Sequence, residues 1–132
     1  MGKVRQEFLA ITEEQAKNKN CRAYIKDETT GKCYGIPVGY FTIGRKDDMD
    51  VDIPIETEDG TISRMQADIR LVRNIIGEFE LSIQDKPMSV NETEVGGHPI
   101  SKYRYTQLFD GERILMGETE FSVYLNPIVD WV

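Results

Sequence analysis

The sequence predicts an all-β fold, in which two mainly antiparallel sheets form a sandwich with functional loops at one end and a short N-terminal helical arm. Three observations support this prediction. Several short runs alternate apolar and polar residues with a period of two, most clearly residues 79–84. Turns containing Gly or Asp separate these runs at intervals of about 8–12 residues, which is typical of sandwiches. Beyond the N-terminal arm, no stretch carries the apolar stripe of a helix.

The first 20 residues differ from the rest, and we expect residues 1–20 to be an arm or linker and residues 21–132 to be the sandwich domain. Thr12, followed three residues later by Gln15, has the pattern of a capping box. In such a box the Thr side chain caps the helix and the Gln side chain reaches back. The pattern therefore predicts a short helix, or a partly ordered arm, that begins after Thr12.

The first hairpin is predicted between residues 23–25 and 34–38, which alternate on either side of a turn near residues 29–30. In this register Cys33 pairs with a residue near Lys26. Gly39 is expected to end the hairpin.

The two cysteines, Cys21 and Cys33, are expected to remain free thiols. The hairpin register directs Cys33 away from Cys21, which disfavours a disulfide on geometric grounds. Free thiols agree with a reducing compartment. The N-terminus lacks the apolar core of a signal peptide, and no apolar run approaches the roughly 20 residues of a membrane span. We therefore expect a cytoplasmic protein without a membrane partner.

The middle of the chain is expected to form short strands joined by polar turns. The predicted strands are residues 40–43, 51–55, 67–72 and 79–84. Pro54 lacks a backbone N–H, which places its strand at a sheet edge or at a strand end. The connections at 57–61 and 74–77 are rich in Gly, Asp and Asn, as turns are.

The C-terminal third begins with a loop-rich stretch, residues 85–98, followed by a short strand or extended connection over 100–108. A turn at Asp110-Gly111 leads into a strand at 113–116. A tight turn at Gly117-Glu118 then leads into a final strand at 120–125. Three apolar residues of that strand share one face: Phe121, Val123 and Leu125.

Composition excludes several classes of function. The net charge is −7 and the pI is about 4.8, whereas binding to a phosphate backbone needs a dominant positive field. We therefore expect no nucleic-acid partner. One histidine and two cysteines cannot supply the ligands of a zinc site, and the acidic run at 47–52 lacks the Gly and distal Glu of a calcium loop. We expect no metal and no cofactor.

No catalytic constellation is evident either. His98 lies in a Gly-Gly-His-Pro loop without a Ser or carboxylate at the spacing of a triad, and it is expected to be structural or exposed. The chain contains neither a Walker-type Gly-rich phosphate-binding loop nor a dinucleotide fingerprint. We therefore expect a binding protein rather than an enzyme.

Three separated segments carry Arg, Ser or Asn, the residue types that bind oxyanions, where strand-like runs meet turns: 43–45, 62–67 and 89–97. Loops that converge at one end of a sandwich would bring these segments together as a phosphate pocket. Because the protein is acidic, such a pocket must be a local basic patch, for which Arg45, Lys46 and Arg64 are candidates.

The ordered series of motifs resembles a divergent, bacterial-type member of the forkhead-associated (FHA) domain family. Its pattern runs Gly-Arg, Ser-Arg-x-His-Ala, Ser-x-Asn-Gly-Thr-x-Val-Asn-Gly, Leu-x-Asp-Gly-Asp-x-Ile-x-x-Gly and a final Phe-rich strand. The corresponding residues here are 44–45, 63–67, 89–97, 108–117 and Phe121. The resemblance implies an FHA/SMAD-like β-sandwich that binds a phosphothreonine-containing protein or peptide, with a Ser/Thr kinase as the source of the phosphate.

The resemblance also implies roles for five residues. Arg45, Ser63 and Arg64 would hold the phosphate, because a guanidinium offers a planar fork of donors and a hydroxyl offers one short donor. Asn91, which has both a donor and an acceptor, would hold the peptide main chain with help from Val90. Without the resemblance, Arg45 reads as a surface residue paired with an acidic neighbour, Ser63 as a turn cap and Asn91 as a left-handed turn position.

Three departures from the family pattern leave an alternative open. The family's His, a structural residue that braces the binding loops, is Gln66 here; a Gly is Glu92; and an Asn is Gly96. The alternative is a degenerate sandwich that serves as a phosphate-independent interaction or assembly domain. Thr12 adds a further hypothesis, because it lies in an acidic stretch and, if phosphorylated, would itself be a ligand for the pocket.

Overall fold

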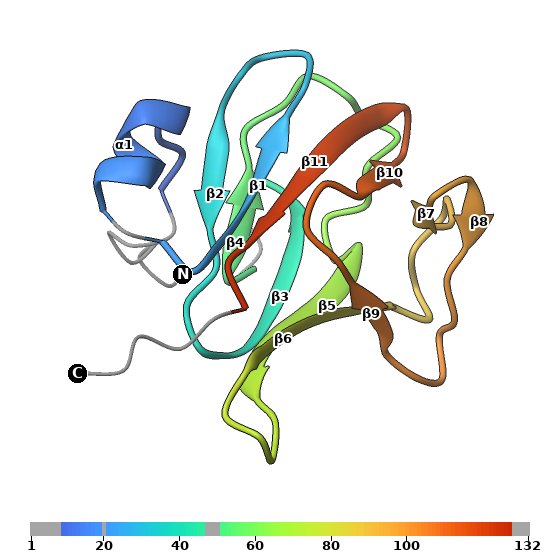
Figure 1. Ribbon diagram of the computed structural model, residues 1–132. Helices are drawn as coiled ribbons and strands as arrows, with labels where there is room; N and C mark the ends of the chain where they lie inside the picture. Colours follow the sequence, from blue (N-terminus) through green and yellow to red (C-terminus); the bar gives the residue numbers. More distant parts are fainter. Residues whose placement is uncertain (1–8, 20, 47–50, 128–132) are drawn as a thin grey trace.

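The computed structural model describes residues 9–19, 21–46 and 51–127 as two β-sheets packed face to face, with one helix against the outside (Figure 1). The elements are α1 (Glu13–Asn18), β1 (Ala23–Asp27), β2 (Cys33–Gly35), β3 (Gly39–Arg45), β4 (Ile53–Ile55), β5 (Ala67–Arg73), β6 (Phe79–Asp85), β7 (Glu94–Val95), β8 (His98–Pro99), β9 (Thr106–Leu108), β10 (Arg113–Met116) and β11 (Thr119–Leu125). The predicted all-β sandwich is confirmed.

Six strands form one sheet in the order β2-β1-β11-β10-β7-β8, and five form the other in the order β4-β3-β5-β6-β9. Among the described strands, every pairing is antiparallel except that of β3 with β4, which is parallel. β4, which carries Pro54, is an edge strand, as its proline predicted.

The core lies between the sheets and follows the predicted period of two. In β5 the residues Ala67, Ile69 and Leu71 are buried and alternate with more exposed ones, and β11 alternates in the same way through Phe121 and Val123. Each fully buried Ile, Leu or Phe contributes about 1.5–3 kcal/mol relative to an exposed one. The alternation thus orients both sheets and fixes which strand ends meet in the loops.

The β1–β2 hairpin has the predicted register, with Lys26 opposite Cys33. Asp27 shapes its turn by accepting hydrogen bonds from the backbone of Thr29 (2.8 Å) and Thr30 (3.3 Å). Both cysteines are free thiols. The prediction that the second strand continues to residue 38 is wrong, because β2 ends at Gly35 and Val38 is exposed.

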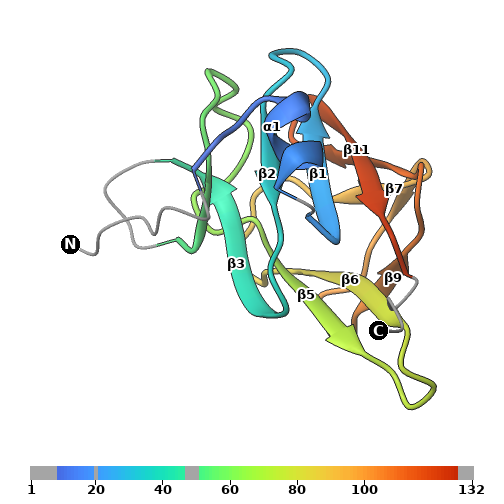
Figure 2. The same cartoon turned by 60° about the vertical axis from the view of Figure 1, so that its left-hand side comes forward.

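The capping box of the N-terminal arm is present. Thr12 accepts a bond from the backbone N–H of Gln15 (3.1 Å), and the Gln15 side chain accepts one from the backbone of Thr12 (2.9 Å). α1 lies against β1 and β2, as Figure 2 shows, and buries Ala16 there. Glu13 anchors the helix by accepting a hydrogen bond from the hydroxyl of Tyr24 (2.9 Å).

Two features of the stretch after β6 were not predicted. A small hairpin, β7–β8, extends the six-stranded sheet within the stretch expected to be loop. The predicted extended segment at 100–108 is a strand only over Thr106–Leu108. His98 is exposed, as expected. Among the residues that the structure describes, no helix is long and apolar enough to span a membrane.

Candidate binding pocket at the loop end

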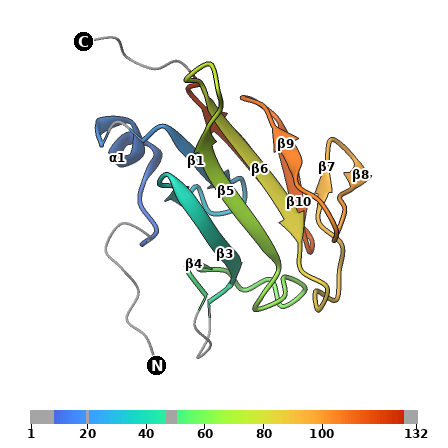
Figure 3. The ribbon, with the colours of Figure 1, turned by 90° about the horizontal axis from the view of Figure 1, so that it is seen from below.

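The loops that carry the candidate residues meet at one end of the five-stranded sheet. Ile43 of β3 is opposite Ala67 at the start of β5, and Ala67 is opposite Asp85 at the end of β6. The end of β3, the start of β5 and the end of β6 therefore share one edge (Figure 3). The loop before β5 ends at this edge and the loop after β6 begins there, and both lie close to Arg45.

Gly44 allows two of these segments to touch. The backbone N–H of Arg45 donates to the carbonyl of Ser63 (3.0 Å), and that of Gln66 donates to the carbonyl of Ile43 (3.0 Å). A Cβ atom at position 44 would lie 2.0 Å from the carbonyl oxygen of Arg64. No side chain fits at that distance, so the Gly-Arg pair permits the backbone of residues 63–64 to lie against β3.

Gln66 links the two loops that flank the pocket. It is fully buried, and its Oε1 accepts a bond from the backbone N–H of Ser63 (2.8 Å). Its Nε2 donates to the carbonyl of Asn91 (2.7 Å) and to the hydroxyl of Thr93 (3.0 Å). This side chain therefore does brace the loops that flank the pocket, although its difference from the family pattern suggested a weakened brace.

The network continues into the sandwich through a buried carboxylate. The hydroxyl of Thr93 donates to Oδ1 of Asp85 (2.6 Å) and its backbone N–H donates to Oδ2 (3.0 Å). Burial raises the pKa of Asp85, and the bonds from Thr93 partly oppose that rise. Gln66, Thr93 and Asp85 thus form a chain of hydrogen bonds that ties the 86–93 loop to the end of β6.

A second anchor holds the loop of residues 57–62. Asp59 accepts bonds from the backbone and the hydroxyl of Thr61, from the backbone of Glu118 (2.9 Å) and from the hydroxyl of Thr119 (2.6 Å). Burial raises the pKa of Asp59, but the bonds from Thr119, Thr61 and Glu118 outweigh it and lower the pKa to about 2. A Cβ atom at Gly117 would lie 2.4 Å from the Thr61 hydroxyl, so this glycine permits the close approach.

These anchors surround an open pocket of about 450 Å³ at the loop end, lined by Arg45, Gly60, Thr61, Ile62, Ser63, Arg64, Met65, Met88, Val90 and Asn91. All five residues singled out from the sequence are in this lining. Lys46, the third candidate for a basic patch, is not; it pairs weakly with Glu56 (3.9 Å). The acidic neighbours of Arg45 in the sequence, Asp47 and Asp50, lie outside the described residues.

The polar side chains of the pocket are held in place by the backbone around them. Nε of Arg45 donates to the carbonyl of Ile62 (3.0 Å), which orients a guanidinium with further donors on its terminal nitrogens. The hydroxyl of Ser63 accepts a bond from the backbone of Val90 (2.9 Å) and keeps its own hydrogen for another acceptor. Nδ2 of Asn91 donates to the carbonyl of Thr61 (2.9 Å).

This arrangement can bind an oxyanion beside a peptide chain. Two guanidinium groups and a hydroxyl offer charge-assisted donors, and Asn91 offers an amide oxygen and a second N–H. Glu92 is exposed and is not part of the lining. Sequence reasoning missed Thr61 and the two methionines of the pocket; the Asp-Gly-Thr run at 59–61 is a turn signal that would have pointed to Thr61.

In the comparison with known families, the model described as "FHA domain" matches residues 41–117, more than half of the chain. Comparison with curated proteins finds no match.

Solved structures give closely similar folds. The FHA domain of FhaA, crystallised in complex with the intracellular domain of Rv3910, is 26% identical over 76% of this chain and 98% of its own, with a TM-score of 0.60. A domain from work on phosphothreonine-dependent FHA interactions is also 26% identical, over 80% and 98%, with a TM-score of 0.62. The FHA domain of CT664 from Chlamydia trachomatis is 22% identical over 84% and 99%, with a TM-score of 0.61, and shares the fold.

Proposed function

The chain belongs to the FHA-domain family, and from this premise we propose that it is a phosphothreonine-dependent module that recruits a phosphorylated partner protein. It acts by binding and carries out no chemistry. The observation that supports the proposal most is that Arg45, Ser63 and Arg64, from two segments that are distant in the sequence, line one pocket. A similar domain, 26% identical, comes from work on phosphothreonine-dependent interactions.

The phosphate is held by Arg45, Ser63 and Arg64 in this proposal. A phosphothreonine carries a charge of about −1.5 to −2 at neutral pH and three acceptor oxygens. The guanidinium of Arg45 supplies a planar fork of donors, the Ser63 hydroxyl supplies one short hydrogen bond, and Arg64 adds positive charge. Since the chain as a whole is acidic at −7, these groups provide the local field that a dianion requires.

The main chain of the partner segment is held by Asn91, with Val90 beside it. The bond from Asn91 to the carbonyl of Thr61 uses one of its two amide hydrogens. Its Oδ1 and the other hydrogen match the N–H and C=O of an extended peptide. A peptide bound in this way lies across both loops that Gln66 connects.

The functional unit is residues 21–132 in this proposal, with residues 1–20 as an arm, and a Ser/Thr kinase prepares the partner. The family match at 41–117 lies within this unit. Thr12 has a structural role that does not require phosphorylation, because its hydroxyl caps α1.

The test is calorimetric titration of the domain with a library-selected phosphothreonine peptide and with the same peptide unphosphorylated. We expect micromolar binding of the first only, and a loss of about 30-fold or more in Arg45→Ala, because a charge-assisted contact to phosphate is removed. Lys32→Ala, which removes one positive charge from the β1–β2 turn, is the matched control and should bind normally. Binding weaker than about millimolar, or equal binding by Arg45→Ala, would reject the proposal.

A further inference from the structure

The outer face of the five-stranded sheet carries a cluster of aromatic and basic side chains. Tyr40 of β3 and Arg70 of β5 are cross-strand partners, and Tyr105 directly precedes β9. The guanidinium carbon of Arg70 lies 4.0 Å from the ring centre of Tyr105 and 6.0 Å from that of Tyr40. We name these three residues the tyrosine–arginine face. The neighbours of Arg70 in β5, Ile69 and Leu71, point into the core, so Arg70 points outward.

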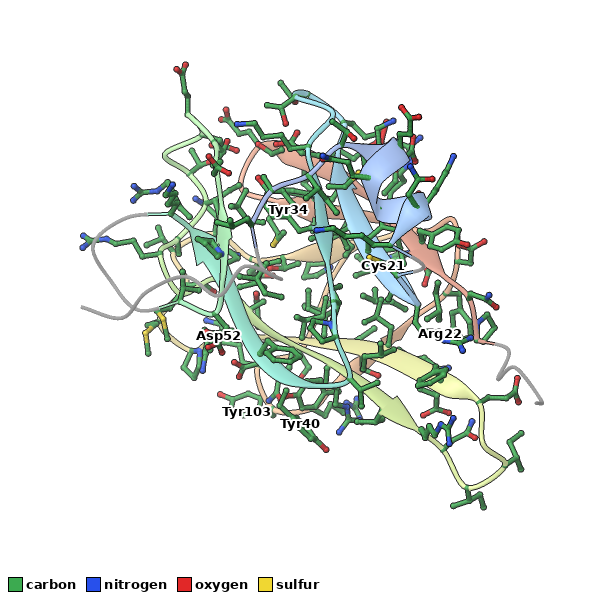
Figure 4. All side chains as sticks on the ribbon, turned by 90° about the vertical axis from the view of Figure 1, so that its left-hand side faces the viewer. Cys21, Arg22, Tyr34, Tyr40, Asp52 and Tyr103 are labelled. Carbon is green, nitrogen blue, oxygen red and sulfur yellow. The ribbon has the colours of Figure 1, made fainter. Side chains whose placement is uncertain are left out.

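This face is open to a partner. Tyr40 is 64% exposed, and Tyr103, in the adjoining segment, is 91% exposed. Figure 4 shows Tyr40 and Tyr103 projecting from the same outer side of the sheet. Tyr and Arg are enriched among the residues that contribute most to binding at protein interfaces. Tyr offers a large area with few rotatable bonds, and Arg offers a planar fork of donors.

Arg70 is arranged to receive an anion. Its Nε is buried and has no hydrogen-bond acceptor among the described residues. The two rings fix the plane of the guanidinium and remove part of its water. A guanidinium that is already ordered and partly dehydrated loses little entropy when a carboxylate binds to its terminal nitrogens.

Basic residues dominate the β6–β9 side of the face. Lys86 pairs with Asp68 at 3.0 Å, next to Arg70 in the sheet. The segment 101–105, which carries Lys102 and Arg104, is attached to β6 by bonds from the backbone of Asp85 to Ser101 (3.0 Å) and from the side chain of Gln84 to Lys102 (2.8 Å). This side of the face thus carries Arg70, Lys86, Lys102 and Arg104 together with two acidic residues, Asp68, which is paired with Lys86, and Glu80 of β6, in a chain whose net charge is −7.

The face is continuous with the pocket. The backbone of Lys86 donates to the carbonyl of Gln66 (3.1 Å), and Lys86 begins the loop whose Met88 and Val90 line the pocket. From Gln66 to Arg70 is four residues along the sheet direction, roughly 13 Å at the rise of a strand. An extended peptide that leaves the pocket over β5 would reach Arg70 within about four residues.

We propose that the tyrosine–arginine face, with Lys86, Lys102 and Arg104, is a second docking surface that binds an acidic segment of the same partner about four or more residues from its phosphothreonine. This inference rests on the proposed function and adds a specificity determinant to it. The partner is then a protein whose phosphorylated threonine is flanked by a run of Asp or Glu. The acidic surface elsewhere repels such a segment, which favours binding to this face.

The experiment compares three phosphothreonine peptides with the same core, one with neutral flanks and two with a run of glutamates about four residues before or after the phosphothreonine. We expect one acidic peptide to bind about 5- to 10-fold tighter than the neutral one at low salt, and we expect this gain to fall at about 0.3 M sodium chloride. Arg70→Ala should abolish the gain and leave the affinity for the neutral peptide unchanged. Lys32→Ala, with the same charge change on the other sheet, should keep the gain.

Absence of a gain with either acidic peptide, or a gain that survives in Arg70→Ala, would overturn the proposal. Arg70→Gln, which keeps much of the side chain over the rings, replaces Arg70→Ala if the latter is less stable. Binding to the face can also be measured independently of the pocket. The NMR chemical shifts of Tyr40 and Tyr105 should change when an unphosphorylated glutamate peptide is added. Shifts there with no binding of any phosphopeptide would reject the proposed function and keep the tyrosine–arginine face as a surface that binds acidic segments. A uridine oligonucleotide that displaces the glutamate peptide would instead assign the face to nucleic acid and overturn the proposal.

Discussion

The side-chain amide of Gln66 donates a hydrogen bond to the main-chain carbonyl of Asn91 at 2.7 Å, although the two residues are 25 positions apart in the sequence. The same side chain accepts from the backbone of Ser63 at 2.8 Å. One buried residue therefore sets the separation between the loop that carries Ser63 and Arg64 and the loop that carries Val90 and Asn91.

Replacement of this side chain should loosen both loops. Gln66→Ala leaves the N–H of Ser63 and the hydroxyl of Thr93 with fewer partners in a buried place, so we expect the free energy of unfolding to fall by about 2–4 kcal/mol. Affinity for a phosphothreonine peptide should fall as well. Urea unfolding and calorimetry measure the two effects, and Gln107→Ala, on an exposed position of β9, serves as the control. If Gln66→Ala changed neither the free energy of unfolding nor the peptide affinity, the loops would hold their positions without this brace.

Gly44→Ala should separate the loop of residues 63–64 from β3. The added methyl would lie 2.0 Å from the carbonyl oxygen of Arg64, so the backbone must move and stability should fall by roughly 2 kcal/mol or more. A Cβ at Gly60 meets no atom within 4 Å, which makes Gly60→Ala the matched control in the same region. Thermal unfolding of both variants decides the matter, and equal melting temperatures would contradict the close approach.

Loss of the Asp59 carboxylate should release the 57–62 loop. Asp59→Asn weakens four hydrogen bonds to an anionic acceptor, and we expect a loss of about 1 kcal/mol, at the low end because the group is partly exposed. Glu118→Gln, an exposed neighbour, is the control.

The lowered pKa of Asp59 determines how the loss of stability in Asp59→Asn depends on pH. The folded pKa of Asp59, about 2, lies below its ordinary value of 3.8. The ionised group therefore stabilises the folded state above about pH 4, and this contribution disappears as the pH falls toward about 2. Urea unfolding should show a clear difference between wild type and Asp59→Asn near pH 7 that narrows toward pH 2. A difference that stays constant would assign the effect to packing instead.

Ser63→Ala distinguishes a phosphate-binding pocket from a phosphate-independent assembly domain. If the hydroxyl contacts phosphate, the variant should lose about 5- to 10-fold in phosphopeptide affinity. A phosphate-independent assembly domain would instead keep its partner in a pull-down with either Ser63→Ala or Arg45→Ala. Circular dichroism checks that Ser63→Ala keeps its fold. The variant also loses the bond from the backbone of Val90 to the Ser63 hydroxyl, and loss of that bond alone should change the fold little.

The elements that local patterns encode were predictable from the sequence. Thr12 and Gln15 form the capping box, and Cys33 lies opposite Lys26, because both relationships depend on residues close together in the chain. The β7–β8 hairpin was missed because its strands have two residues each, too few for a period to appear. The prediction that this strand reaches residue 38 was wrong because Val38 is exposed, and an exposed apolar residue gives a misleading signal of burial.

The candidate site was predictable as a set of residue types and not as a network. The order of the motifs pointed to Arg45, Ser63 and Asn91, and the pocket brings them together. The bonds of Gln66 to Ser63 and Asn91 depend on how three loops pack, which no local pattern records. From sequence alone, its difference from the family's histidine looked like a loss, whereas an amide can supply the acceptor and the donors that the position requires.

The amide at position 66 has one further consequence. A histidine at this position would gain a proton within the range of about pH 5 to 8, whereas an amide has no proton to gain there. The second ionisation of phosphothreonine falls in the same range, with a pKa of about 6. Gln66 therefore keeps one protonation state across this range, while a phosphothreonine bound as we propose would change its own. A titration of affinity against pH would therefore measure the charge of the phosphate with little contribution from the brace.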